Sequence, residues 1–152
     1  MRCTLRRLRM KLLCILALLM TAPLLSPPAQ AGDSTVAVTT NSGTTYQLDF
    51  DSFTFAKSGN RFPDIHIAKS DDCANIQVTR KNTSSLSVGA TDRKCRCERP
   101  THLISVTTKT GASFEGVMSD NACGSWGIAG KDVGTGSNVS FSAGDISSIT
   151  FP

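Results

Sequence analysis

The chain has 152 residues and a formal net charge of +4, with 16 lysine and arginine residues against 12 aspartate and glutamate residues. Five of the basic residues and none of the acidic ones lie in the first 31 positions, which leaves 11 basic and 12 acidic residues in the rest of the chain. A nearly neutral chain of this length excludes a bulk electrostatic attraction to nucleic acid or to an anionic membrane, and it fits one domain.

The first 31 residues are predicted to form a secretory signal peptide that is cleaved after Ala31. A basic start is followed by the short apolar run Leu12–Met20, and Pro27–Ala31 ends in the small-x-small pattern that signal peptidase reads. The apolar run is too short to span a bilayer comfortably. We therefore expect a secreted or periplasmic protein that has no membrane span after leader removal, with residues 32–152 as its single exported domain.

Four cysteines remain in the mature chain, and they are predicted to form two disulfides. An even number of cysteines in a small exported domain is typical of a disulfide framework. Cys95 and Cys97 are too close to pair readily with each other, so we expect one of them to pair with Cys73 and the other with Cys123. The choice between these two connectivities stays open. A zinc site is the alternative, but structural zinc sites prefer cysteines with two to four residues between them, and we expect no metal or cofactor.

The mature sequence predicts an all-β fold. Threonine, serine, valine, isoleucine and glycine dominate it, and amphipathic helical periodicity is nearly absent. In the first part, residues 32–100, we expect a hairpin at 38–46 and a short strand in which Ile65 and Ile67 place His66 on the polar face.

A further hairpin is predicted in this first part. Residues 76–79 and 86–88 both alternate apolar and polar side chains, and a polar stretch separates them. Asn82 and Asn138 each begin a glycosylation sequon, which matters only in a eukaryotic secretory host.

The last part of the chain, residues 101–152, has the clearest strand pattern. Leu103–Thr108 and Ser113–Met118 alternate around Gly111, which predicts a β-hairpin. Further strands are expected on both sides of the glycine-rich loop 134–137, and a tight polar turn leads into a last short strand.

This order of strands resembles a small SH3-like or Sm-like β-barrel, in which a one-turn helix commonly precedes the final strand. The resemblance covers residues 101–152 and implies a fold without implying a function. The fold class expected from the sequence is therefore a small disulfide-stapled all-β domain with SH3-like barrel character in its C-terminal half.

Two stretches near the mature N-terminus resemble parts of the C-terminal unit. Val38–Tyr46 is similar to Val106–Phe114, and Asp49–Phe55 is similar to Asp145–Phe151. Internal similarity of this kind predicts a repeated structural element. The alternative is a chance likeness between hairpins that are rich in threonine, serine and glycine.

One charged cluster lies between the two parts of the chain, and its basic residues are Arg93, Lys94, Arg96 and Arg99. Arginine side chains in such a cluster can hold a carboxylate or a phosphate, so the cluster is a candidate patch for an anion or a partner. The alternative is a solvated linker that carries two disulfide cysteines.

The sequence contains few candidates for catalysis. It has two histidines, His66 and His102, and it lacks a nucleophile elbow, a P-loop, a Rossmann glycine pattern and an EF-hand loop. Asp49 and Asp51 would share one face of a strand, which suits a solvated edge as well as a site. We therefore predict no catalytic residues.

The function expected from the sequence is a non-catalytic binding or structural module of the cell envelope or the extracellular space. Its partner would be a protein or an envelope polymer. One alternative is a small secreted hydrolase that uses His102 or His66 with a nearby aspartate. The other is a secreted protease inhibitor whose rigid loop is held by the disulfides.

Overall fold

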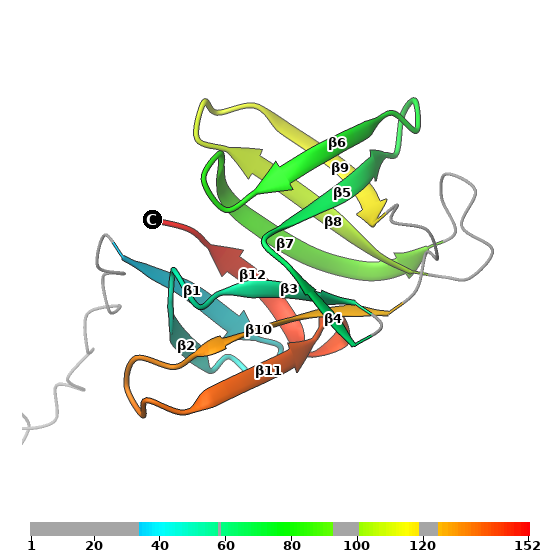
Figure 1. Cartoon of the computed structure of the whole chain (residues 1–152). Helices are drawn as coiled ribbons and strands as arrows, with labels where there is room; N and C mark the ends of the chain where they lie inside the picture. The colour runs from blue at the N-terminus through cyan, green and yellow to red at the C-terminus, as the bar shows by residue number, and fades with distance from the viewer. Residues whose placement is uncertain (1–33, 58, 93–100, 119–124) are drawn as a thin grey trace, which may run out of the picture. The chain divides into compact units, whose positions relative to one another are not determined.

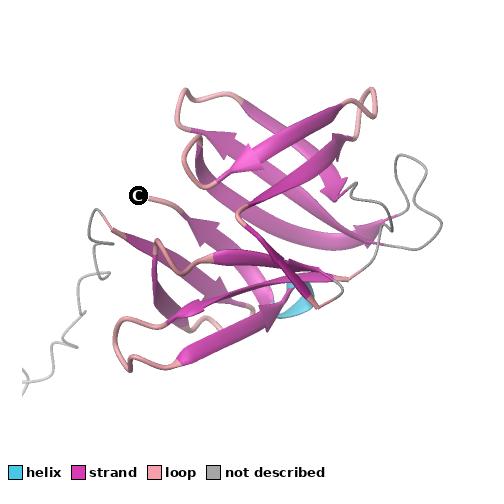
Figure 2. Ribbon diagram, in the orientation of Figure 1, coloured by secondary structure: helices cyan, strands magenta, loops and turns pink. Residues whose placement is uncertain are grey.

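The protein is built almost entirely of β-strands. A computed structural model describes residues 34–57, 59–92, 101–118 and 125–152, and Figures 1 and 2 show strands joined by short turns. The strands are β1 (Thr35–Thr40), β2 (Thr45–Asp49), β3 (Thr54–Lys57), β4 (Asn60–Phe62), β5 (Asp64–Lys69), β6 (Asn75–Thr79), β7 (Thr83–Asp92), β8 (Thr101–Thr108), β9 (Ser113–Met118), β10 (Trp126–Lys131), β11 (Asn138–Ser142) and β12 (Ile146–Thr150). A single 3-10 turn, η1 (Ala143–Asp145), precedes β12. The all-β prediction is confirmed.

The strands form two antiparallel sheets. The larger has the order β2-β1-β12-β7-β8-β9-β5-β6, and the smaller has the order β11-β10-β3-β4. A β-bridge between Leu48 and Asp132 joins the end of β2 to the residue that follows β10. Among the described strands no barrel closes completely, because β6, β11 and β4 each end a sheet.

One hydrophobic core serves both sheets. Its buried side chains alternate along the strands with more exposed ones, as in β1, where Val36 and Val38 are fully buried. Three phenylalanines lie at its centre: the ring of Phe53 meets the rings of Phe55 and Phe151 edge to face, with centroid distances of 5.2 and 5.4 Å. The core joins residues from the first and last strands of the chain, so neither end is dispensable for it.

The chain contains the same hairpin twice. Thr39 lies opposite Thr45 between β1 and β2, and Thr107 lies opposite Ser113 between β8 and β9, 68 positions later in both strands. The offset of 68 holds for all five residue pairs of the two ladders. The predicted similarity of these hairpins is confirmed at the level of strand register.

The two hairpin turns also have the same hydrogen bonds. The N–H of Thr40 donates to the carbonyl of Thr44 at 2.9 Å, and the N–H of Thr108 donates to the carbonyl of Ala112 at 2.8 Å. The hydroxyls of these two threonines donate to the same carbonyls, at 3.1 and 3.2 Å. Each turn contains one glycine with positive φ, 84° and 86°.

A second hairpin is duplicated as well. Ile67 lies opposite Ile76 between β5 and β6, and Gly130 lies opposite Val139 between β10 and β11, 63 positions later in both strands. The offset of 63 again holds for all five pairs. The offset falls from 68 to 63 because equivalent positions in β2 and β5 are separated by five residues more than those in β9 and β10. The longer segment contains β3 and β4.

Strand β7 ends the first copy and β12 ends the second, and these two equivalent strands pair with each other. Val38 of β1 lies opposite Ile149 of β12, and the equivalent Val106 of β8 lies opposite Leu86 of β7. Leu86 and Ile149 also lie directly opposite each other where β7 and β12 pair. This antiparallel pairing of two equivalent strands gives the middle of the larger sheet an approximate two-fold symmetry.

We call β1, β2, β5, β6 and β7 repeat 1, and β8 to β12 repeat 2. Strand pairing then divides these strands differently: β1 and β2 associate with β12, β10 and β11 in a first module, whereas β5 to β9 form a second module. Figure 1 shows the second module in green to yellow and the first at the blue and the orange-red ends of the colour scale. Each repeat thus contributes two strands to one module and three strands to the other.

Three expected strand arrangements need correction. The hairpin of residues 76–79 with 86–88 is wrong, because β6 pairs with β5 and β7 pairs with β8 and β12. The match of 49–55 with 145–151 is also wrong, since the pairing makes 82–88 the counterpart of 145–151. The unit 101–152 has the expected strand order and one-turn helix, but it does not close by itself: its strands pair with β1, β5 and β7 in the larger sheet and with β3 in the smaller one.

Asp49 and Asp51 do not share a strand face. The Oδ1 atom of Asp49 accepts the N–H groups of Asp51 and Ser52, at 2.7 and 3.2 Å. This turn ends β2 after Asp49, as expected of an aspartate whose side chain bonds the backbone two residues further on.

Gly116 provides a test of the contact between the repeats in the second module. It lies on β9 opposite Lys69 of β5, and a Cβ atom there would overlap the carbonyl oxygen of Ala68 and lie 2.6 Å from Cγ2 of Ile67. We expect Gly116→Ala to lower the free energy of unfolding by roughly 2 kcal/mol or more in urea titrations, since overpacking against backbone costs about 1–3 kcal/mol.

Gly89→Ala is the matched control. A Cβ atom at Gly89 would lie 3.6 Å from the nearest atom, which is ordinary contact. A stability loss in Gly116→Ala no larger than that in Gly89→Ala would contradict the close approach of β9 to β5.

Candidate functional site

Most of the residues that the sequence singled out lie outside the described residues. This applies to Cys95, Cys97 and Cys123, to the basic cluster Arg93, Lys94, Arg96 and Arg99, and to the predicted leader. Cys73 lies in the turn between β5 and β6 and has a φ of 55°, and Gly136 holds the equivalent place in repeat 2 with a φ of 71°. The disulfides and the anion patch stay predictions.

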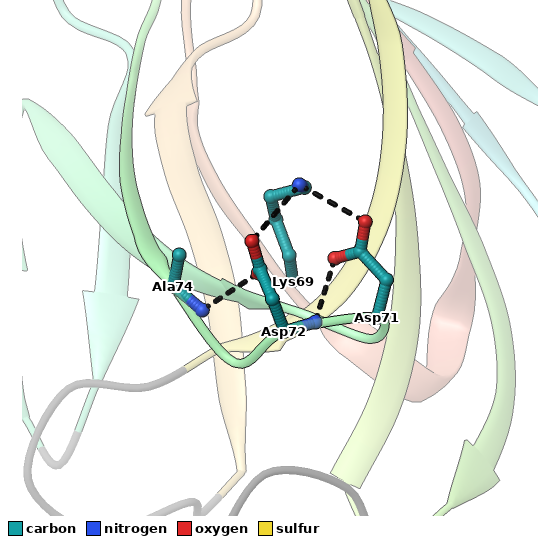
Figure 3. A network of polar contacts seen from close by, with 4 residues as sticks. All are labelled: Lys69, Asp71, Asp72 and Ala74. Atoms are coloured by element: carbon teal, nitrogen blue, oxygen red, sulfur yellow. Dashed lines mark hydrogen bonds and ion pairs between the residues drawn. The ribbon is translucent and has the colours of Figure 1, made fainter.

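The turn at Cys73 is organised by charge. Figure 3 shows the Nζ atom of Lys69 in contact with both Asp71 and Asp72. It lies 3.0 Å from Oδ2 of Asp71 and 3.4 Å from Oδ2 of Asp72. Asp71 also accepts the N–H of Asp72 at 2.8 Å, and Asp72 accepts the N–H of Ala74 at 2.9 Å. The hydrogen bond from Lys69 lowers the pKa of Asp71, and the same bond raises the pKa of Lys69. Both aspartates therefore shape a turn.

Asp132 holds the equivalent turn in repeat 2. Its Oδ2 atom accepts the hydroxyl of Thr135 at 2.7 Å and the N–H of the same residue at 3.1 Å. The hydroxyl bond is the main cause of the lowered pKa of Asp132. The carboxylate is thus committed to the turn between β10 and β11.

Neither histidine is part of a described catalytic arrangement. His66 is exposed on β5 between the buried Ile65 and Ile67, so its predicted orientation is confirmed. The Nδ1 atom of His102 lies 2.9 Å from the carbonyl oxygen of Gly89, at the irregularity between β7 and β8. A backbone carbonyl orients this ring, and the hydrolase alternative gains no support from it.

Arg80 connects the two modules. It lies in the turn between β6 and β7, and its Nη1 atom donates to the carbonyl oxygens of Phe50, Asp51 and Phe53 in the turn between β2 and β3. The bonds to Asp51 and Phe53 are both 3.2 Å long. Its guanidinium carbon also lies 4.8 Å from the centre of the Phe50 ring, a cation–π distance. The equivalent residue of repeat 2 is Ala143, so only one repeat has this connection.

Strand β11 forms one edge of the smaller sheet. The N–H of Asp132 donates to the carbonyl of Ser137, and bonded pairs alternate along an antiparallel ladder. The N–H and C=O groups of Asn138, Ser140 and Ser142 therefore point away from β10, and all three residues are exposed. The strand has no charged residue, no proline and no register shift, which are the usual devices that protect an edge.

The equivalent edge, β6, is partly closed. By the same alternation, the N–H and C=O groups that point away from β5 belong to Asn75, Gln77 and Thr79. At Thr79, however, the side chain of Asn82 accepts the N–H at 3.0 Å, and the N–H of Asn82 donates to the carbonyl at 3.2 Å. Ser142 is the counterpart of Thr79: its C=O begins η1 and accepts the first hydrogen bond of that turn, but no side chain accepts its N–H. The two copies thus differ in how much of their edge is available.

A groove of about 310 Å³ lies beside the edge of β11, where β3, β10, β11 and η1 meet. Its lining includes Ser140 and Ser142 of β11, Ala56 of β3, Gly127 of β10, and Asp145 at the end of η1. Its lining is mostly small and polar, so it extends the surface of the edge without offering a deep apolar pocket.

Among the described residues no group of three or more histidine, cysteine or acidic side chains could hold a metal ion. In the same part of the chain, no helix has both the length and the apolar character needed to cross a membrane. No protein-family model matches the sequence, and comparisons with curated proteins and with solved structures found no match.

The sequence reasoning did not identify Arg80 or the edge of β11. The edge had one signal: Asn75–Thr79 and Asn138–Ser142 both begin with asparagine, alternate apolar and polar residues, and lack charge. An alignment of these stretches would have shown a repeated edge strand. Arg80 gave no signal, because its acceptors are backbone carbonyls 27–30 positions away.

Arg80→Met is expected to lower the free energy of unfolding by about 2 kcal/mol, because hydrogen bonds from a charged group contribute about 1.5–3 kcal/mol. Methionine keeps the apolar stem and removes the guanidinium. Urea titration measures the change, and Lys81→Met at the exposed neighbouring position is the control. Equal stability of the two variants would show that Arg80 does not hold the modules together.

Asp132 gives a pH-dependent prediction. A lowered folded pKa means that the group stabilises the fold above its unfolded pKa, and that this stability is lost as pH falls through the folded pKa. Thr135→Val should raise the pKa of Asp132 towards its ordinary value, whereas Thr135→Ser should leave it low. Carboxyl-carbon NMR titration measures both, and an unchanged pKa in Thr135→Val would contradict the assigned cause.

Proposed function

We propose that the protein is an exported, non-catalytic binding module that recognises an extended protein segment by adding it to the edge of β11. The observation that carries this proposal is the exposed edge, where the main-chain groups of Asn138 and Ser140 and the N–H of Ser142 point away from β10. An extended segment gains affinity at such an edge from main-chain hydrogen bonds, and side chains that alternate between the two faces add specificity.

A non-catalytic role is supported by how the described carboxylates are used. Asp49 ends a strand, Asp71 and Asp72 bind Lys69, and Asp132 binds Thr135. A general base needs a proton-accepting group within hydrogen-bond reach of a substrate. These carboxylates instead make turns, which suits a rigid scaffold.

Export and disulfides belong to the same proposal. The basic and apolar first 31 residues would direct the chain across a membrane, and Cys73, Cys95, Cys97 and Cys123 would form two disulfides outside the cytoplasm. Each disulfide would stabilise the fold by about 2–4 kcal/mol. A rigid body presents an ordered edge strand, so its partner meets a preformed template.

The SH3-like comparison applies best to the modules. In the first module, β1, β2, β10 and β11 are followed by the one-turn helix η1 and by β12, which returns to pair with β1. We propose that each module is an SH3-like unit assembled from both repeats. This resemblance concerns the fold and does not carry the binding role.

The binding role is tested by blocking the edge. In Ser140→Pro the proline ring replaces an outward N–H and leaves the bonds between β10 and β11 in place. We expect the tagged, exported variant to lose the envelope proteins that the unchanged protein retains. Gln77→Pro, the equivalent change on β6, should retain them.

The proposal fails if the unchanged protein retains no envelope protein. It also fails if Ser140→Pro retains the same proteins as Gln77→Pro. Far-UV circular dichroism of both variants controls for folding.

A further inference from the structure

We propose that the segment bound at the β11 edge is β11 of a second copy, so that two chains associate as a symmetric antiparallel pair. This inference rests on the proposed function, because it names the partner of the same edge. It is argued from the register, the charge and the side chains of β11.

The outward groups of β11 are spaced for self-pairing. In an antiparallel pairing centred on Ser140, this residue lies opposite Ser140 of the second copy, and Asn138 lies opposite Ser142 of the second copy. These three residues are the ones whose N–H and C=O groups point away from β10. Opposed pairs of this kind exchange up to two hydrogen bonds each, and the C=O of Ser142 already accepts a bond within η1, so the pairing supplies about four main-chain bonds.

The side chains of the paired edge are compatible with this register. Val139 would lie opposite Phe141 of the second copy, and both residues are half-buried and pack against the core from the same face. A pairing of a β-branched with an aromatic side chain stabilises adjacent strands. The other face would carry only the polar side chains of Asn138, Ser140 and Ser142, which stay exposed to solvent in the paired strands.

Charge does not oppose the association. A symmetric pairing brings equivalent residues together, so a charged edge strand would place like charges opposite each other. The stretch from Gly134 to Gly144 has no charged residue, and Asp145 would lie opposite the neutral Thr135 of the second copy. The equivalent edge on β6 is less suited, because the side chain of Asn82 already accepts the N–H of Thr79.

The chain already contains an association of this type. Strands β7 and β12 are equivalent members of the two repeats, and they pair antiparallel with Leu86 opposite Ile149. A five-residue edge makes a smaller interface than a standard protein complex, so the dimer is expected to be weak and concentration-dependent.

Sedimentation equilibrium of the purified exported protein, from about 10 μM to 1 mM, tests the inference. We expect the mass to rise from one chain towards two with concentration. Ser140→Pro should keep the mass of one chain throughout, and Gln77→Pro should follow the unchanged protein. A single-chain mass at the highest concentration, or an equal association of Ser140→Pro, overturns the inference.

A second variant tests the register directly. Opposed residues in a bonded antiparallel pair have Cα atoms about 5.5 Å apart, within the range that a disulfide spans. Ser140→Cys should therefore give a covalent dimer under mild oxidation, and Gln77→Cys should not. Equal yields of covalent dimer from the two variants overturn the symmetric register.

The two proposals fail separately. A protein that stays monomeric but retains envelope proteins through the edge of β11 contradicts self-pairing and leaves the binding module in place. A protein that pairs with itself and retains no envelope protein supports self-pairing and removes the wider binding role.

Discussion

The fold depends on the antiparallel pairing of β7 with β12. Leu86 and Ile149 face each other there, and neither side chain is exposed. Each strand also pairs on its other side with the first strand of a hairpin, β8 or β1. The pairing therefore joins two equivalent three-stranded units into one sheet, and it places residues from both ends of the chain in one core. Loss of this contact would expose the main-chain groups and the apolar faces of both units.

The differences between the repeats are as informative as their similarity. Where repeat 1 has Arg80, which binds three carbonyls, repeat 2 has the buried Ala143. Where the side chain of Asn82 accepts the N–H of Thr79 at the end of β6, no side chain accepts the N–H of Ser142 at the end of β11. One copy thus uses its last turn to connect the modules, while the other leaves a sheet edge available. For this reason we propose that the binding role belongs to repeat 2.

The sequence predicted the local structure well. Alternating residues in Leu103–Thr108 and Ser113–Met118 located a hairpin that the structure confirms, and the likeness of Val38–Tyr46 to Val106–Phe114 located its copy. Both succeed because a hairpin is fixed by its own alternation and its own turn.

The order of the strands could not be predicted in the same way. Strand β6 ends at Thr79, and the next strand, β7, does not pair with it. Instead β7 pairs with β8 and with β12, which comes much later in the sequence. Alternation shows which face of a strand is buried, but it does not show which strand lies beside it. The candidate edge of β11 depends on that order, because a strand is an edge only when one side has no neighbour.

Native-state hydrogen exchange tests most directly whether the repeats form one interdependent body. Main-chain amides in β1, β5, β8 and β10 that bond to neighbouring strands should exchange with one common free energy, equal to that of global unfolding, because each module contains strands of both repeats. A second module that opens at a clearly lower free energy than the first would contradict this account.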